Sequence, residues 1–202
     1  MTPLTEYFLN REEEIRRRKH HLDIWDQQGK YQSVTFHTAD SLPAEVRKEI
    51  EKIRLQFLDK YPLPWTESVT RRFRSIIGKR NDSLLDAGYG RCVFKESEIR
   101  KVLSDAIWYY AGERYEIVRY VIMPNHVHML VRMLGEYDLE KTINSIRRFS
   151  ATRINRMLGT DGEFWYGENY MRLIRSLKHF DTVKAYIADN PKYLKEGEYE
   201  LW

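Results

Sequence analysis

Hydrophobic and polar positions alternate along several short segments of the chain, and other segments repeat apolar positions at helical spacing. Alternation and β-branched residues predict strands at 31–37, 115–122, 126–133 and 169–175, with the middle two joined as a hairpin across 123–125. Apolar positions three and four residues apart predict helices at 96–111 and 138–158. The resulting βαββαβ order predicts an α+β fold, a ferredoxin-like antiparallel sheet with helices on one face, followed by one more helix.

Three segments fall outside this plan. Residues 1–30 carry a basic run and are expected to form a partly helical arm, and residues 195–202 a short tail. Pro43 opens a helix whose apolar positions include Ile50, Ile53 and Phe57. The stretch 61–90 mixes prolines and glycines with arginines and is interpreted as an irregular excursion. Residues from about 40 to 90 are therefore expected to be an insertion into the sheet.

The composition fits a single domain. The 202 residues, 42% of them hydrophobic, can bury one ordinary core. The formal charge of +4 and the clustering of arginines favour a polyanionic partner. A single cysteine, Cys92, excludes an intrachain disulfide and indicates a reducing compartment, and no apolar run suits a membrane span or a signal peptide. We expect a soluble, cytoplasmic protein.

Two histidines on the predicted strand 126–133 are candidates for a metal site. Side chains of a strand point to opposite faces in turn, so Val127 and Met129 belong to an apolar face that should lie on the core. His126 and His128 share the other face, two residues apart, where two imidazole nitrogens can reach one metal ion. The same spacing would also arise from two histidines on a solvated strand face.

The strings around and beyond these histidines resemble one family. YVIMPNHVHMLV (120–131) resembles the histidine-hydrophobic-histidine motif, called HUH, of single-tyrosine transposases, specifically the REP-associated tyrosine transposases of the IS200-like group. RRFSATRINR (147–156), GEFWYGENYMRLIR (162–175) and VKAYIADNP (183–191) follow in the order that the family shows, and VTFHTADSLP (34–43) and LDAGYG (85–90) precede them. The resemblance covers about residues 31–194, which are expected to form the transposase domain.

The resemblance implies a metal-dependent enzyme that cuts and rejoins single-stranded hairpin DNA. Tyr186 matches the nucleophile on the catalytic C-terminal helix, and His126, His128 and Asn190 match the metal ligands. Attack by the tyrosine would give a 5′-phosphotyrosine and a free 3′-hydroxyl. Mg²⁺ or Mn²⁺ is the cofactor of the family, although imidazole ligands also accept Zn²⁺. No nucleotide cofactor is expected, and the enzyme would work as a monomer or a homodimer.

A basic and aromatic surface is expected to bind the DNA. The predicted helix 138–158 has an apolar face, so its arginines should project outward and follow a phosphate backbone, while an unpaired base could stack on a tryptophan. The candidate DNA-binding residues are Arg147, Arg148, Arg153, Arg156, Trp165, Arg172 and Arg175.

Three alternative functions share parts of this pattern. The first is a non-catalytic single-stranded nucleic-acid-binding module on the same fold, for which Tyr186 would be dispensable; the RNP-type aromatic motif of such modules is missing from the sequence. The second is a zinc hydrolase, for which a His-Glu-x-x-His helix is missing. The third is an HUH replication or mobilisation nuclease, which shares the chemistry.

Overall fold

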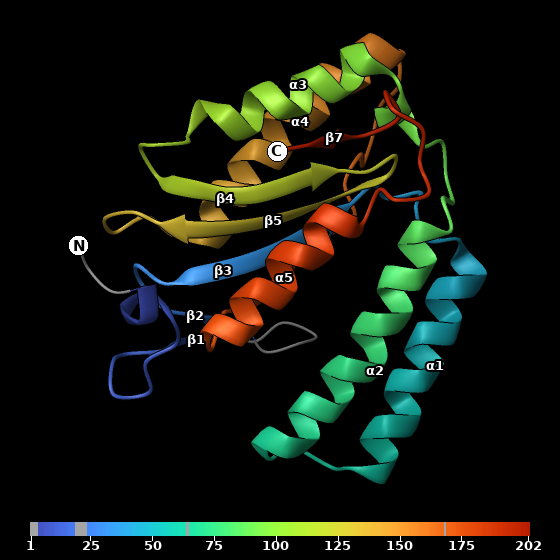
Figure 1. The fold of residues 1–202 in the computed structure, drawn as a ribbon. Coiled ribbons are helices and arrows are strands. Elements are labelled where there is room, and N and C mark those ends of the chain that lie inside the picture. Colours follow the sequence, from blue (N-terminus) through green and yellow to red (C-terminus); the bar gives the residue numbers. More distant parts are fainter. Residues whose placement is uncertain (1–3, 19–23, 64, 168) are drawn as a thin grey trace.

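The protein is built on a five-stranded antiparallel sheet of order β6-β3-β5-β4-β7 (Figure 1). The computed structural model describes residues 4–18, 24–63, 65–167 and 169–202. The strands are β3 (Tyr31–His37), β4 (Tyr115–Ile122), β5 (His126–Met133), β6 (Tyr170–Leu173) and β7 (Glu200–Leu201). Without β7, the order is that of the ferredoxin-like βαββαβ plan, so the predicted fold class is confirmed.

Two helices cover one face of this sheet: α3 (Ser97–Tyr109) and α4 (Leu139–Leu158). The alternation predicted for β5 is confirmed, because Val127, Met129, Val131 and Met133 are buried in the core shared with these helices. The Asp138 side chain accepts from the backbone N–H of Lys141 and starts α4, and Gly159, with φ of 61°, ends it.

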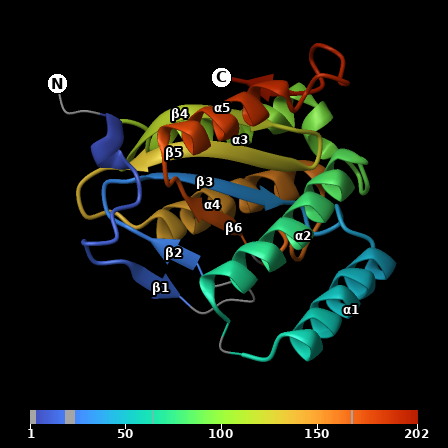
Figure 2. The ribbon, with the colours of Figure 1, turned by 60° about the horizontal axis from the view of Figure 1, so that its bottom comes forward.

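The helix α5 (Leu177–Asp189) packs on the opposite face of the sheet (Figures 1 and 2). Its side chains Phe180 and Ile187 pack with Leu130 of β5 and Val121 of β4. The Ser176 hydroxyl caps its first turn by accepting from the backbone N–H of His179. The face of the sheet that carries the two histidines is therefore covered by α5.

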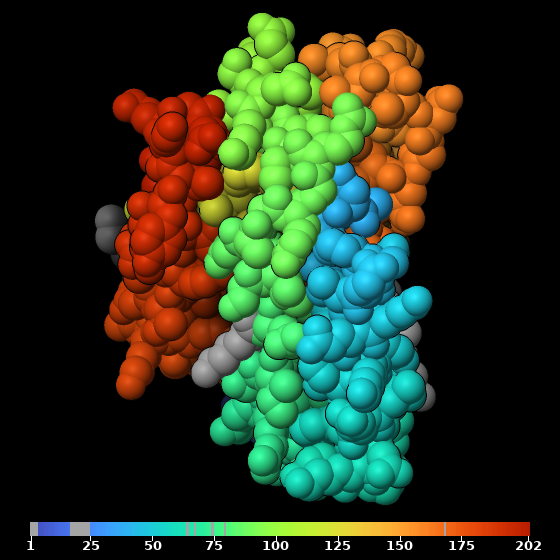
Figure 3. Space-filling view, turned by 90° about the vertical axis from the view of Figure 1, so that its right-hand side faces the viewer, coloured from blue at the N-terminus to red at the C-terminus, as the bar shows by residue number. Residues whose placement is uncertain are grey.

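The segment predicted as an irregular excursion is mostly helical, so that prediction is wrong. The helix α2 (Glu67–Asp86), capped by the Thr66 side chain, occupies it and forms a hairpin with α1 (Ala44–Lys60), the helix that was predicted after Pro43. The hairpin has a small aromatic core of its own, with Phe57 against Phe73 at 4.9 Å between ring centroids. It stands beside α5 rather than on the sheet, with α2 between α1 and the C-terminal segment (Figure 3).

The N-terminal segment, expected to be a partly helical arm, contains little helix. Among its described residues, only the short 3-10 helix η1 (Leu4–Tyr7) is helical, and β1 (Arg16–Arg18) pairs with β2 (Ile24–Asp26) in an antiparallel ribbon. The rest of the basic run, 19–23, lies outside the described residues. At the other end, the 195–202 tail contributes β7, which pairs with β4 at the edge of the sheet. Within the described part, no helix is long and apolar enough to cross a membrane.

Candidate active site

The two histidines of β5 lie side by side between the sheet and α5. Their exposed fractions are 0% for His126 and 3% for His128, so they do not belong to a solvated strand face. Their ring centroids are 4.7 Å apart with the planes nearly perpendicular. Burial lowers the pKa of His128 from 6.5 to about 3 and lowers the pKa of His126 well below its usual range. Both imidazoles are therefore neutral at pH 7, the form that binds metal ions.

A chain of hydrogen bonds fixes which nitrogen of His126 is free. The amide nitrogen of Asn125 donates to the Tyr89 carbonyl at 2.9 Å, which turns its amide oxygen toward Nδ1 of His126 at 2.7 Å. Because the amide oxygen can only accept, Nδ1 must carry the proton and Nε2 the lone pair. This buried Nε2 has no hydrogen-bond partner among the described residues. His126 thus presents an unshared electron pair, as a metal ligand does.

His128 connects the sheet to α5. Its Nδ1 is 2.7 Å from the hydroxyl of Thr35 on the neighbouring strand, and its Nε2 is 3.4 Å from the Tyr186 hydroxyl. Tyr186 remains 37% exposed, so its side chain both contacts His128 and is reachable from solvent. The β3–β5 pairing and the docking of α5 together bring these three side chains into contact.

Asn190 caps the C-terminus of α5, one helical turn after Tyr186. Its side chain interacts with the Tyr186 hydroxyl and lowers the pKa of that phenol, although other influences outweigh it. The amide oxygen of Asn190 is buried and has no hydrogen-bond partner in the described part of the chain. The structure thus gathers Tyr186, His126, His128 and Asn190, the four residues that the sequence singled out for the chemistry.

Two carboxylates that the sequence analysis missed also reach this site. Asp82 and Asp86 lie one turn apart at the end of α2, and burial and Asp86 raise the pKa of Asp82 to about 6. Burial, followed by the charges of Asp82 and Asp86, raises the pKa of Tyr186 above its usual range. The signal available in the sequence was the i, i+4 pair of acids, but their segment was interpreted as irregular.

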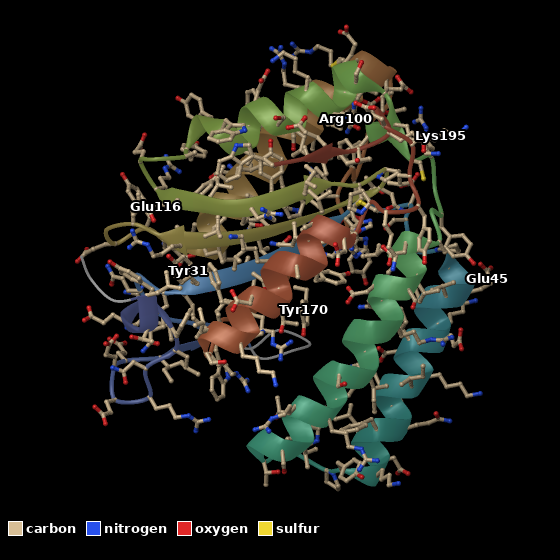
Figure 4. The ribbon with its side chains drawn as sticks, viewed as in Figure 1. Tyr31, Glu45, Arg100, Glu116, Tyr170 and Lys195 are labelled. Atoms are coloured by element: carbon tan, nitrogen blue, oxygen red, sulfur yellow. The ribbon has the colours of Figure 1, made fainter. Side chains whose placement is uncertain are left out.

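A groove of about 220 Å³ lies beside these residues, between α5 and the sheet strands β3 and β6, and Asp82 of α2 also lines it. Asp82, His128 and Tyr186 line one part of it, and Tyr170 and Arg172 of β6 line another. In Figure 4, Tyr170 points into the gap between α5 and α2, in agreement with this lining. The groove gives a polyanion a path to the Tyr186 hydroxyl.

The predicted DNA-binding residues do not form one surface with this groove. Arg148, Arg153 and Arg156 are exposed as expected, but α4 lies on the other face of the sheet. Arg147 does not project outward: its guanidinium donates to the Tyr166 carbonyl and to the Asn144 side chain, and burial lowers its pKa.

The three remaining candidate DNA-binding residues have different outcomes. Trp165 is 4% exposed and its ring nitrogen donates to the Arg147 carbonyl, so it is a core residue and the prediction that it stacks on bases is wrong. Arg172 lines the groove, and its buried Nε has no hydrogen-bond partner among the residues described. Arg175 lies between β6 and α5, where its backbone N–H donates to His179.

A metal ion at this site would need more than one donor type. In the described ranges, no three His, Cys, Asp or Glu side chains are grouped so as to hold a metal ion by themselves. Two neutral imidazoles and one amide oxygen do fit a divalent cation as donors, and two of these donors are otherwise buried without partners.

The sheet holds a histidine pair beside a helical tyrosine, with the rings of His128 and Tyr186 5.2 Å apart, and a comparison with known families identifies the class of protein. Residues 87–190 match the family described as "Transposase IS200 like", and this match covers more than half of the chain. The chain belongs to the IS200-like transposases, and it is accordingly a DNA-cleaving and -joining enzyme.

Two solved structures are similar to this chain at low identity. One is described as a REP-associated tyrosine transposase bound to a REP hairpin, with 14% identity, a TM-score of 0.46, and coverage of 83% of this chain and 69% of that one. The other, a putative transposase from Deinococcus radiodurans R1, has 12% identity, a TM-score of 0.33, and coverage of 79% and 89%. No curated protein matches the chain.

Proposed function

We propose that this transposase is an HUH-type enzyme that cleaves and rejoins single-stranded hairpin DNA through a covalent 5′-phosphotyrosine at Tyr186. The observation that carries the proposal is the position of the Tyr186 hydroxyl, 3.4 Å from Nε2 of a buried, neutral His128. A tyrosine that only packed would not be held by a histidine pair at the end of a groove. We assign the catalytic unit to residues 31–194, with the α1–α2 hairpin as its insertion.

The donor set supports a divalent cation held by His126, His128 and Asn190. Nε2 of His126 and the amide oxygen of Asn190 are buried acceptors without partners in the described structure, and such atoms are costly unless something binds them. Mg²⁺ or Mn²⁺ would bind there and polarise the scissile phosphate. Single-stranded hairpin DNA as substrate rests on the resemblance of the sequence strings.

The side chains of the site can position the phenol of Tyr186 and take up its proton. Nε2 of His128 and the side chain of Asn190 contact the phenol oxygen of Tyr186, and a cation on that nitrogen would take the place of the hydroxyl proton there. The phenol is protonated at neutral pH and must lose its proton to attack. Asp82 interacts with the phenol and can accept that proton. The oxygen of Tyr186 then bonds to phosphorus, the bond to the 3′ oxygen breaks, and that oxygen takes the proton held by Asp82 and leaves as a 3′-hydroxyl.

One structural feature argues against the binding-module alternative. A module of that kind uses exposed aromatic side chains on an open sheet face. Here that face is covered by α5, which packs Phe180 and Ile187 on it.

The test is the formation of a covalent protein–DNA adduct. The full chain would be incubated with Mn²⁺ or Mg²⁺ and labelled hairpin oligonucleotides drawn from repeats near its own gene, then run on a denaturing gel. We expect an adduct that keeps the label on the 3′ side of the cut and that disappears with a chelator or with Tyr186→Phe. The matched control is Tyr193→Phe, since Tyr193 is 88% exposed and lies seven residues later. DNA binding without an adduct across many hairpins would refute the proposal.

A further inference from the structure

The end of α2 places a carboxylate directly opposite the free nitrogen of His126. Oδ1 of Asp86 is 3.8 Å from Nε2 of His126. Because Asn125 holds the proton on Nδ1, Nε2 presents a lone pair, and the carboxylate oxygen facing it presents another. Two electron-pair donors therefore face each other without a proton between them. A cation bound between them would accept both electron pairs and remove their mutual repulsion.

From this geometry we propose that Asp86 is a ligand of the cation that His126 and His128 hold, in addition to Asn190. The proposal rests on the proposed function, because it concerns the same ion. Two ligands that each lie about 2.1 Å from an octahedral ion are about 3.0 Å apart when adjacent and about 4.2 Å apart when opposite. The separation of 3.8 Å between Asp86 and His126 lies between these two values, so a small rotation of the Asp86 side chain would bring it to either one.

The structure holds Asp86 at this position through the loop that follows it. The carbonyl of Tyr89 accepts from Asn125, the same side chain that orients His126. Gly90 then passes so close to Asp40 that an added Cβ would lie 2.8 Å from the Asp40 backbone, and Arg91 donates its N–H to the Asp40 carboxylate at 2.8 Å. The loop therefore fixes the end of α2 to the site.

The carboxylate itself keeps some freedom. Its side chain is half exposed; burial raises the pKa of Asp86, and the charge of Lys192 offsets part of that rise. The site is not a closed three-ligand cage in the described structure, so Asp86 would turn toward the ion while the two buried imidazoles stay fixed. Two fixed imidazole ligands and one movable carboxylate ligand suit an ion that must also accept phosphate oxygens.

The presence of a carboxylate determines which cation the site prefers. Imidazole ligands suit Zn²⁺ as well as Mn²⁺, whereas each added carboxylate favours hard ions such as Mg²⁺ and Mn²⁺. Replacing Asp86 with asparagine should therefore weaken Mn²⁺ binding more than Zn²⁺ binding. The same substitution should also remove the repulsion between the two lone pairs in the metal-free protein, because the amide nitrogen of the new asparagine can donate to Nε2 of His126.

The experiment is calorimetric titration of the full chain with Mn²⁺ and with Zn²⁺, without DNA. The variants are Asp86→Asn, His126→Ala, and Asp105→Asn, which removes the same charge from an exposed carboxylate paired with Lys101 on α3. We expect Asp86→Asn to weaken Mn²⁺ binding at least about tenfold, Zn²⁺ binding less, and Asp105→Asn neither. The melting temperature of metal-free Asp86→Asn should not fall.

Each contrary result has a separate meaning. A wild-type chain that binds neither ion would overturn the proposed function together with this inference. Binding that His126→Ala abolishes but Asp86→Asn leaves unchanged would overturn the inference alone. Equal losses of Mn²⁺ affinity in Asp86→Asn and Asp105→Asn would reduce the effect to net charge and also overturn it. A lower melting temperature of metal-free Asp86→Asn would assign Asp86 a structural role instead.

Discussion

Acid should destabilise this protein through its buried histidines, and His128 provides the measurable case. Its pKa is lowered by burial from 6.5 to about 3. The unfolded chain therefore takes up a proton below pH 6.5, whereas the folded chain does not until about pH 3. The stability associated with neutral His128 is complete above pH 6.5 and is lost progressively as the pH falls toward 3.

The magnitude follows from the linkage relation. Each pH unit between the two pKa values costs about 1.4 kcal/mol for one group. At pH 5 the chain is about 1.5 units below the unfolded value, so His128 alone should cost about 2 kcal/mol of unfolding free energy relative to pH 7. His126 acts in the same direction, because burial also lowers its pKa.

The assay compares urea unfolding of the wild type and of His128→Gln at pH 7 and pH 5, with a chelator present so that no metal ion binds. Glutamine can keep a hydrogen bond to Thr35, which lies 2.7 Å from Nδ1, but cannot titrate. The wild type should lose about 2 kcal/mol more than the variant between the two pH values. Equal losses would refute the reasoning, because they would mean that His128 takes up its proton within the folded structure.

Three further substitutions test other parts of the structure. Asn125→Ala removes the acceptor that holds the proton on His126, and Mn²⁺ affinity measured by calorimetry should fall about 10- to 100-fold, whereas unchanged affinity would contradict the assigned orientation. Phe73→Ala empties the core of the α1–α2 hairpin at a cost of about 3–5 kcal/mol, so hydrogen exchange should rise in the hairpin and not in β5; uniform exchange would show that the hairpin is not a separate unit. Trp165→Ala should cost about 3–5 kcal/mol in urea unfolding, and a stable variant that only loses DNA affinity would restore the stacking role.

The sheet and the histidine pair could be predicted because a strand has a strict period of two. Once residues 126–133 were assigned as a strand, the apolar side chains at odd positions had to face the core, and His126 and His128 had to share the other face. The strand limits of β4 and β5 match the prediction, and so does the order of the sheet. Alternation does not reveal that the second face is also buried, which depends on where α5 packs.

The contribution of α2 could not be predicted in the same way. Val69, Phe73 and Ile77 lie four residues apart and do indicate a helix, but arginines, glycine and the preceding prolines obscured the pattern. Their apolar partners lie on α1, so the small core of the hairpin is a tertiary feature. When no helix is predicted at this position, the orientation of the Asp86 side chain is unknown, and the sequence gives no reason to place it near a histidine forty residues later. The ribbon β1–β2 was missed for a related reason, since strands of three residues are too short to show an apolar period and β1 consists of arginines alone.

The charges of the assembled site explain why a cation and DNA should act together. Both imidazoles are neutral and the phenol of Tyr186 is protonated at pH 7, and the charges that act on the phenol are those of the carboxyl groups Asp82 and Asp86. These carboxylates would repel a phosphate and oppose formation of the phenolate. A divalent cation reverses the sign of the local charge, so it should favour both the approach of the phosphate and the loss of the phenol proton. Because such coupling is reciprocal, DNA in the groove should tighten the binding of the ion by the same factor.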